Sequence, residues 1–277
     1  MSQSLDSTLV ICDLDNLLLG ADGNLTQVIR DVLQLFSSRG GKLTVFSQRT
    51  PRAVRALLGS VRLSAPALVC GGTMAYHFAD GSRWQLCSFA DQDEDLLPRL
   101  PSAAGVGIAL QMRDGSTRVL RMSDALERHL RQEWTPYLLS NAADIRREEV
   151  LRVLLYQDVR SLPVISLLER ALGDSTTAML SERAAADLLL LTPKQVTGRE
   201  MLEAVCMPTG INPENVLVLA GSMPMLELLR AAGDSAAAAD APAELRLAAK
   251  KVTLTDSRGG AAAEVLYRMV RDAEKLA

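Results

Sequence analysis

Two carboxylates follow the first apolar run of the chain, which reads VICDLDNLLL over residues 10–19. Asp13 and Asp15 stand one residue apart at the end of a run that otherwise has the composition of a buried strand. Burying two charges there is unfavourable unless another group uses them. A turn or a helix cap is one such use, and action on a bound ligand is the other.

Other polar and small residues recur at the ends of later apolar runs. Three more predicted strands end in such residues. Strand 42–47 ends in Ser47, strand 67–72 ends in Gly71 and Gly72, and strand 214–221 ends in Gly221, which Ser222 follows. In open parallel sheets, ligands bind beyond the carboxyl ends of the strands. We therefore expect these strand ends to meet at one crevice. A Ser-x-Arg pair at Ser47 and Arg49 favours a ligand site over two isolated turn aspartates.

The elements that must position these residues alternate between strand and helix. The first ninety residues predict strand 8–14, helix 24–41, strand 42–47, helix 51–60 and strand 67–72. The pattern returns after Thr192 with helix 198–210, strand 214–221, helix 223–233, a short strand and helix within 236–249, and a last helix over 260–276. Strand and helix alternating with short links indicate a parallel sheet covered by helices.

The middle of the chain has a different pattern. It predicts strands 106–112 and 116–122 as a hairpin, helix 123–134, strand 149–156, helix 162–172, and two strands around 176–180 and 186–191. We therefore expect an α/β protein with a Rossmann-like, three-layer αβα core over 1–81 and 191–277. A separate α+β domain over 82–190 is expected to be inserted into that core.

Composition excludes several classes of function. The 277 residues are 48% hydrophobic with a formal net charge of −3, and aromatic residues make up only 4%. No basic run could follow a nucleic acid backbone, and no apolar run approaches a membrane span. The scattered cysteines Cys12, Cys70, Cys87 and Cys206 indicate free thiols in a reducing compartment. The first residues do not read as a signal peptide, so a cytoplasmic protein is expected.

Taken together, these motifs resemble the haloacid dehalogenase-like (HAD) superfamily, and within it the Cof-type phosphatases with an inserted cap. The family opening Asp-x-Asp-Gly-Thr-Leu stands here as residues 13–18, and its Ser/Thr-Gly-Arg as 47–49. Its Asn-Gly-Ala stands as 71–73, its Pro-x-x-Val-Ser-Lys-Gly as 193–199, and its Gly-Asp loop with Met-Leu as 221–229. The resemblance extends over nearly the whole chain.

The resemblance implies a mechanism and a set of roles. Asp13 would attack phosphorus to form an aspartyl-phosphate, and Asp15 would serve as general acid and then base. The Ser47 hydroxyl and a backbone N–H at Gln48 would hold the phosphoryl oxygens. Further pocket candidates are Arg49, Gly71, Gly72, Lys194 and Arg199. The implied cofactor is Mg²⁺, with Asp13, Asp15 and either Ser222 or Glu227 as its candidate ligands.

The implied partner is a small phosphorylated metabolite, such as a sugar phosphate, with neither nucleic acid nor membrane involved. The chain is expected to act as a monomer or a homodimer. In the family the inserted cap chooses the substrate, and no motif in this cap identifies one.

The sequence also departs from the family at several positions. Gly198 stands where the family has its lysine, and Ser222 and Leu226 stand where aspartates belong. Lys194, Arg199 and Glu227 are the nearest charged substitutes. Losing one well-placed electrostatic group costs ~3–4 kcal/mol in comparable sites, on the order of 10²–10³ in rate. We therefore expect activity to be weak or absent.

Two interpretations stay open on these grounds. The chain could be a hydrolase with residual magnesium-dependent activity, or a non-catalytic protein that binds a phosphometabolite or serves regulation. A pure scaffold would explain the lost acids but not the presence of Asp13, Asp15 and Ser47.

Overall fold

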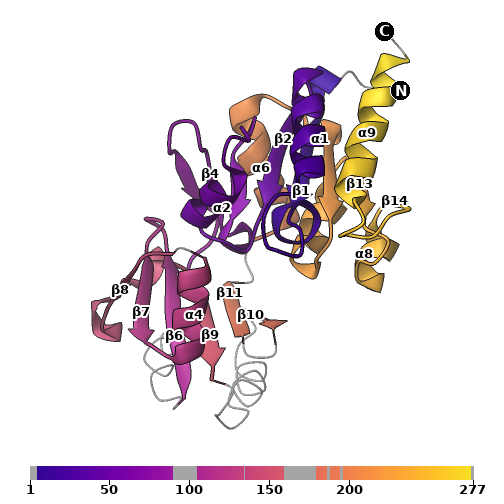
Figure 1. The fold of residues 1–277 in the computed structure, drawn as a ribbon. Coiled ribbons are helices and arrows are strands. Elements are labelled where there is room, and N and C mark those ends of the chain that lie inside the picture. Colours follow the sequence, from indigo (N-terminus) through magenta and orange to yellow (C-terminus); the bar gives the residue numbers. More distant parts are fainter. Residues whose placement is uncertain are drawn as a thin grey trace. The chain divides into compact units, whose positions relative to one another are not determined.

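The computed structural model of the chain describes residues 5–89, 105–133, 135–158, 179–185, 188–193 and 196–275. Two compact units are present (Figure 1). The first consists of Met1–Gln48, Val54–Trp84 and Thr197–Ala277, and the second of Arg49–Ala53 and Gln85–Val196. Each unit has a sheet of its own, and each is described separately below.

The first unit contains an eight-stranded sheet in the order β14-β13-β12-β1-β2-β3-β4-β5. Its strands are β1 (Leu9–Asp13), β2 (Lys42–Phe46), β3 (Ala67–Val69), β4 (Met74–Tyr76), β5 (Arg83–Gln85), β12 (Val216–Ala220), β13 (Asp234–Ala237) and β14 (Lys251–Val252). Neighbours from β14 to β3 run parallel, and β4 runs antiparallel to β3. The predicted parallel sheet is thus confirmed.

The central strands β1 and β12 are buried along their whole length. Continuous apolar runs of this kind are typical of parallel strands covered on both faces, because neither face meets water. The register pairs Asp13 with Phe46 and Cys12 with Leu219. The carboxyl ends of β1, β2 and β12 therefore lie side by side.

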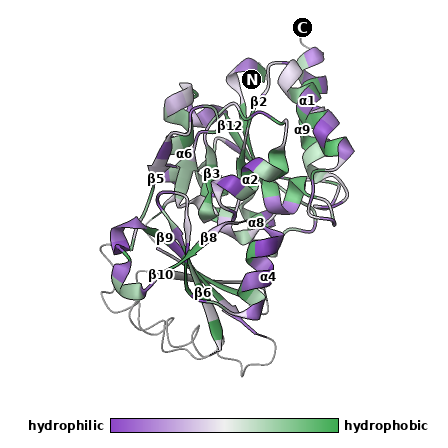
Figure 2. Cartoon of the chain, turned by 60° about the vertical axis from the view of Figure 1, so that its left-hand side comes forward, coloured by the Kyte–Doolittle hydropathy of each residue, from purple (hydrophilic) through white to green (hydrophobic). Residues whose placement is uncertain are grey.

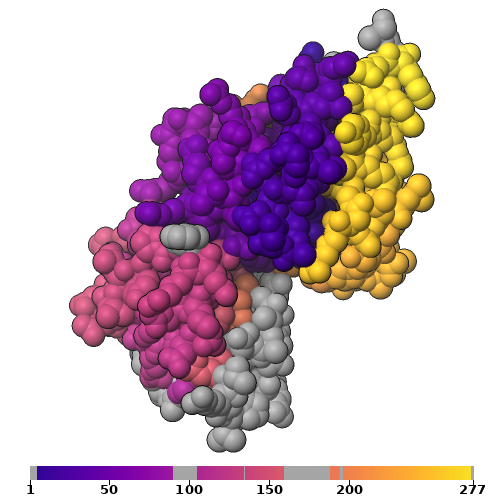
Figure 3. All heavy atoms as spheres, viewed as in Figure 1, coloured from indigo at the N-terminus to yellow at the C-terminus, as the bar shows by residue number. Residues whose placement is uncertain are grey.

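Helices cover this sheet in two groups. They are α1 (Gln27–Ser38), α6 (Gly198–Cys206), α7 (Leu226–Ala231), α8 (Ala243–Ala248) and α9 (Ala261–Glu274), while α2 (Pro51–Leu58) lies between β2 and β3 along the chain. In one group α1 packs against α9, so that the N-terminal and C-terminal segments lie together (Figures 1 and 3). In the other, α7 packs against both α6 and α8. With the sheet between them, these groups form the predicted three-layer core.

Local signals set the helix boundaries. The side chain of Thr26 accepts a hydrogen bond from the backbone N–H of Ile29, so α1 begins later than the predicted residue 24. Thr197 and Glu200 form a reciprocal capping box at the start of α6. Along α1 and α9, hydrophobic and hydrophilic residues alternate in the manner of helices with one buried face (Figure 2).

The second unit contains a six-stranded sheet in the order β10-β11-β9-β6-β7-β8. Its strands are β6 (Val106–Met112), β7 (Thr117–Arg121), β8 (Tyr137–Leu139), β9 (Val150–Gln157), β10 (Met179–Ala185) and β11 (Leu188–Pro193). Helix α4 (Asp124–Gln132) packs on one face through Leu126 and Leu130. All pairs are antiparallel except β7 with β8, which confirms a mixed α+β module.

Some predictions lie elsewhere or were missed. The helix predicted over 162–172 lies outside the described residues, as does part of the strand predicted over 176–180. Strands β4, β5, β8 and β14 were not predicted; the first three have three residues each and β14 has two. Cys12, Cys70, Cys87 and Cys206 are all buried and none of their thiols is in a disulfide, as expected of thiols that serve as small apolar residues. Within the described ranges, no helix combines the length and apolarity that crossing a bilayer requires.

Candidate functional site

The carboxyl ends of three parallel strands bring the predicted residues together. The Ser222 hydroxyl, just beyond β12, donates a hydrogen bond of 2.6 Å to Asp13 Oδ2, although 209 positions separate the two residues. The Ser47 hydroxyl, just beyond β2, donates one of 2.9 Å to Asp15 Oδ2. Residues 13, 15, 47 and 222 therefore form one cluster at this edge of the first unit's sheet.

A tight turn after β1 contains Asp15 and is capped by Asp13. Residues Leu14–Leu18 form a single π-helical turn, with Asp13 as its N-cap. Asp13 Oδ1 accepts the backbone N–H of Asn16 at 3.1 Å. Leu14, Leu17 and Leu18 are buried and anchor this turn in the core. Single π-helical turns are uncommon and occur frequently at functional sites.

Neutral groups surround the Asp13 carboxylate. The Asn16 side-chain amide donates to both Asp13 oxygens at 3.1 Å, in addition to the Asn16 backbone N–H and the Ser222 hydroxyl. Asp13 is only 1% exposed. Burial raises the pKa of Asp13 to about 6; the hydrogen bond from Ser222 opposes the rise, the charge of Asp15 adds to it, and Asn16 opposes it. Asp13 therefore gains its charge close to neutral pH.

The second aspartate has a different environment. Asp15 is partly exposed, and its Oδ2 accepts the Ser47 hydroxyl at 2.9 Å and the backbone N–H of Gln48 at 2.7 Å. These are the two donors that the family resemblance assigns to the phosphoryl oxygens of a substrate. In this structure the carboxylate of Asp15 accepts hydrogen bonds from both.

The described residues do not fit a Mg²⁺ ion as they stand. Magnesium requires oxygen lone pairs in near-octahedral geometry. Here both oxygens of Asp13 accept hydrogens from Asn16 and Ser222, and Ser222 offers a neutral hydroxyl rather than a carboxylate. Among the residues that the structure describes, no group of three or more His, Cys, Asp or Glu side chains could hold a metal ion. Glu227 does not join Asp13, since its exposed carboxylate pairs with Arg230 at 2.9 Å.

The charged pocket candidates differ in where they lie. Arg49 is part of the second unit, where it forms an ion pair with Glu133. Arg199 is exposed on α6 and pairs with Glu203 at 2.8 Å. Lys194 lies outside the described residues. None of these observations brings a cation to Asp13.

The glycine candidates have structural reasons to be glycine. Gly71 and Gly72 have φ angles of 70° and 85°, a left-handed conformation that suits glycine. The Gly71 N–H donates to the Ser47 carbonyl at 2.9 Å, so this amide is already used within the loop. A Cβ on Gly72 would lie 2.5 Å from the sulfur of Met201. Both glycines thus serve the backbone next to Ser47.

Gly198 lies at a closer contact still. A Cβ on this residue would be 1.8 Å from the carbonyl oxygen of Glu227, because the first turn of α6 packs directly on the backbone of α7. No side chain fits there without moving the two helices apart. This contact requires glycine at position 198.

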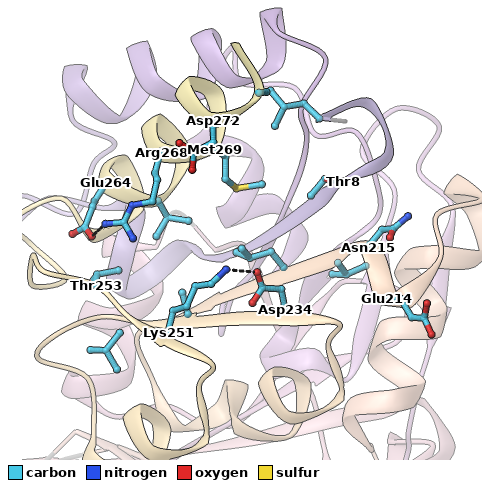
Figure 4. Close-up of a pocket in the computed structure, with 17 residues that line it drawn as sticks. Thr8, Glu214, Asn215, Asp234, Lys251, Thr253, Glu264, Arg268, Met269 and Asp272 are labelled. Carbon is cyan, nitrogen blue, oxygen red and sulfur yellow. Dashed lines mark hydrogen bonds and ion pairs between the residues drawn. The ribbon is translucent and has the colours of Figure 1, made fainter. Parts of the chain in front are cut away.

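A separate hollow of about 240 Å³ lies at the amino ends of β1, β12, β13 and β14, beside α9 (Figure 4). Its walls carry paired charges: Lys251 contacts Asp234 at 2.6 Å, and Arg268 contacts Glu264 at 2.8 Å. None of the predicted site residues lines it. The hollow is therefore distinct from the aspartate cluster, which lies at the opposite edge of the sheet.

Sequence reasoning missed one member of the site. No role was predicted for Asn16, yet its backbone and side chain both donate hydrogen bonds to Asp13. The available signal was its place three residues after Asp13, where Asx-type caps hydrogen bond to the backbone. Side-chain contact with both carboxylate oxygens required the geometry of the turn.

Comparison with known proteins identifies the family of this chain. A sequence profile of the haloacid dehalogenase-like hydrolases matches residues 10–266. No curated protein sequence matches the chain significantly.

Many solved structures share the fold. A protein from Thermotoga maritima superposes with a TM-score of 0.78 at 16% identity, covering 94% of this chain and 97% of the other. A haloacid dehalogenase-like hydrolase from Bacteroides thetaiotaomicron gives 0.76 at 18%, covering 95% and 99%. A subclass IIB sugar phosphatase of the HAD superfamily gives 0.74 at 13%, covering 95% and 99%. Identities this low establish the fold alone. The match of the family profile to nearly the whole length shows that this chain belongs to the haloacid dehalogenase-like hydrolases.

Proposed function

We propose that this chain is a HAD-like phosphatase relative that accepts a small phosphorylated metabolite and turns it over weakly or not at all. The observation that carries the proposal is that, among the described residues, the hydrogen-bond donors to Asp13 are all neutral. Its carboxylate is held by Asn16 and Ser222, where attack on an anionic phosphate calls for positive charge. Phosphoryl transfer depends mainly on positioning and charge neutralisation, so a nucleophile without counter-charge is poorly equipped for it.

The chain keeps part of the machinery that such a reaction uses. Asp13 is the nucleophile candidate, and burial places its pKa at about 6, so at neutral pH it is mostly ionised. Asp15 is the candidate for moving a proton to and from the leaving oxygen. Ser47 and the Gln48 backbone are the candidates for holding phosphoryl oxygens, through donors that point out from the end of β2.

The packing at Gly198 supports the loss of the lysine. The family motif Val-Ser-Lys-Gly ends in glycine, and Gly198 is the position that the α6–α7 contact restricts to glycine. Aligning these two glycines places Thr197 opposite the lysine, and aligning the motif one residue later places Gly198 there. Neither residue carries a charge. Thr197 instead caps α6 by accepting the backbone N–H of Glu200 at 3.2 Å.

The substrate class follows from the family and from one neighbour. A solved relative of the same fold is a sugar phosphatase, which makes a sugar phosphate the first ligand to test. We assign the choice of ligand to the inserted domain, predicted over residues 82–190. The second candidate function is ligand binding without turnover, and the retained Ser47 and Gln48 donors favour it, because an anion site needs no nucleophile.

The test compares hydrolysis of a generic aryl phosphate by the wild type and by Asp13→Asn, each with and without MgCl₂. We expect the two rates to be nearly equal and insensitive to magnesium. Asp31→Asn is the matched control, because Asp31 is exposed on α1 and bonds only to Gln27 among the contacts seen. A robust magnesium-dependent rate that Asp13→Asn abolishes and Asp31→Asn preserves would refute the proposal.

Magnesium calorimetry separates the two candidate functions. Saturable binding to the wild type that Asp13→Asn removes would favour a residual hydrolase. Heat of sugar phosphate binding without any magnesium signal would favour a protein that binds without turnover.

A further inference from the structure

The contact between Asp15 and the end of β2 has an unusual composition. One oxygen, Oδ2, accepts both the Ser47 hydroxyl at 2.9 Å and the Gln48 backbone N–H at 2.7 Å. A hydroxyl and a backbone N–H converging on one anionic oxygen make a small oxyanion cradle. Hydrogen bonds to an ionised acceptor are about twice as strong as neutral ones.

The cradle itself is fixed by the sheet. The Ser47 N–H donates to the Leu68 carbonyl at 2.8 Å, and the Ser47 carbonyl accepts the Gly71 N–H at 2.9 Å. Ser47 is fully buried, whereas Asp15 is partly exposed. The backbone that carries both donors is therefore held in place, whereas the Asp15 side chain lies nearer to solvent.

We propose that Asp15 is an internal anion that occupies the oxyanion cradle of Ser47 and Gln48, so that an incoming phosphoryl group must displace it. The inference rests on the proposed function in one respect, the assignment of this cradle to phosphate. It adds that the resting protein is closed to phosphate by its own carboxylate. Two anions cannot share the two donors, because like charges at hydrogen-bond distance repel strongly.

Displacement has a geometric consequence for the neighbouring turn. Asp15 lies inside the π-helical turn that Asp13 caps and Asn16 ties to the Asp13 carboxylate. A rotation of the Asp15 side chain alone frees the cradle and leaves the Asn16–Asp13 contacts in place. A ligand can thus occupy the cradle while Asp13 keeps its contacts with Asn16 and does not attack.

The experiment measures binding of inorganic phosphate and of vanadate by calorimetry, with the full chain and without magnesium. Asp15→Ala removes the internal anion and should bind both oxyanions at least about tenfold more tightly than the wild type. Asp31→Ala makes the same change of charge at an exposed position on α1, and it should bind as the wild type does. The double variant with Ser47→Ala added should lose the gain.

A second variant guards against misfolding. Asp15→Asn keeps the size and one acceptor oxygen but removes the charge, so it should show a smaller gain than Asp15→Ala. Phosphate should also raise the melting temperature of whichever Asp15 variant folds by more than it raises that of Asp31→Ala. If both Asp15 variants bind the oxyanions no better than Asp31→Ala, the internal-anion role is wrong.

This result is independent of turnover. Robust hydrolysis by the wild type would overturn the proposed function but would leave the binding comparison intact. Conversely, equal binding by all the variants would overturn the internal-anion role and leave the loss of turnover standing.

Discussion

Two carboxylates of the first unit, those of Asp13 and Glu264, have closely similar hydrogen-bond partners, yet their pKa values shift in opposite directions. Asp13 accepts three neutral groups: the Asn16 backbone N–H, the Asn16 amide and the Ser222 hydroxyl. Glu264, at the opposite edge of the sheet, also accepts three: the backbone N–H groups of Leu254 and Thr255 and the Thr255 hydroxyl. Glu264 has in addition the Arg268 guanidinium at 2.8 Å.

Their pKa values move in opposite directions. Burial raises the pKa of Asp13 to about 6 in spite of its donors. Burial also acts to raise the pKa of Glu264, but the backbone and hydroxyl donors of Thr255 and Leu254, with Arg268, outweigh it and lower that pKa. Asp13 is 1% exposed, whereas the Glu264 side chain is 15% exposed. Neutral groups donate hydrogen bonds to the carboxylate in both places. The two carboxylates differ in their access to solvent and in the presence of a neighbouring cation, and these differences set the direction of the pKa shift.

The largest test of this comparison adds a second carboxylate beside Asp13. Ser222→Asp should destabilise the protein by on the order of 3 kcal/mol at about pH 8, because a second carboxylate then stands beside the buried charge of Asp13. Millimolar MgCl₂ should recover much of that loss, since the variant offers a metal the acid that the wild type lacks. Urea denaturation with and without magnesium measures both effects.

Ser222→Asn is the control for Ser222→Asp. It has nearly the same size but no charge, so its stability should not respond to magnesium. If magnesium stabilises neither variant, the acid at position 222 is not what separates this chain from a metal site.

The next test removes the charge of Asp13. Asp13→Asn should be more stable than the wild type at about pH 8 by up to ~3 kcal/mol, because the Asp13 pKa rises from 3.8 to about 6 and each unit is worth ~1.4 kcal/mol. The folded wild type binds the proton more tightly than the unfolded chain does. Its stability therefore falls as the pH rises from about 4 to about 6.

The pH profile makes this prediction specific. The advantage of Asp13→Asn should vanish below about pH 4, where Asp13 is protonated in both folded and unfolded chains. Thermal or urea unfolding across that range measures it. A variant that is less stable than the wild type at every pH would mean that the carboxylate is better stabilised than its burial indicates.

Glu264→Gln should have the opposite sign. The pKa of Glu264 is lowered on folding, so its charge stabilises the protein above its ordinary pKa, and this stabilisation is lost as the pH falls through the lower, folded value. The variant should lose about 1.5–3 kcal/mol near neutral pH, the range for hydrogen bonds to a charged group. Glu244→Gln, at an exposed position on α8, is the matched control, and its free energy of unfolding should change little. If both variants lose the same free energy of unfolding, the charge of Glu264 does not stabilise the protein and its comparison with Asp13 fails.

Much of this arrangement followed from sequence patterns. Continuous apolar runs predicted β1 and β12, and the rule that ligands meet the carboxyl ends of parallel strands predicted that Asp13, Ser47 and Ser222 lie together. Those predictions succeed because burial and chain connectivity leave few alternatives. Glu227 shows the limit: its distance from Ser222 along the chain was short, but its helical direction points it to Arg230 and solvent.

The details that set the electrostatics were not predictable from the sequence. The π-helical turn of Leu14–Leu18 depends on the fit of three leucines into the core as well as on the Asp13 cap. The requirement for glycine at 198 arises from the approach of two helices that meet only in the folded chain. Strand β8 has Tyr137, Leu138 and Leu139 all exposed, so its residues carry no alternating pattern. Each feature depends on contacts between segments far apart or on exposed edges.

The smallest expected effect comes from a variant that separates the two differences between Glu264 and Asp13, namely access to solvent and a neighbouring cation. Arg268→Met keeps the apolar stem and removes the cation, leaving the three neutral donors of Glu264 and its access to solvent. Because the Arg268 side chain is 47% exposed and pairs one helical turn away, its loss should cost only about 0.5 kcal/mol, and high salt should erase the difference. NMR titration of Glu264 should then still give a pKa below its ordinary value. If Arg268→Met instead costs as much as Glu264→Gln and returns that pKa to normal, the cation rather than solvent distinguishes Glu264 from Asp13. Counter-charge alone would then be expected to lower the pKa of Asp13 toward its ordinary value.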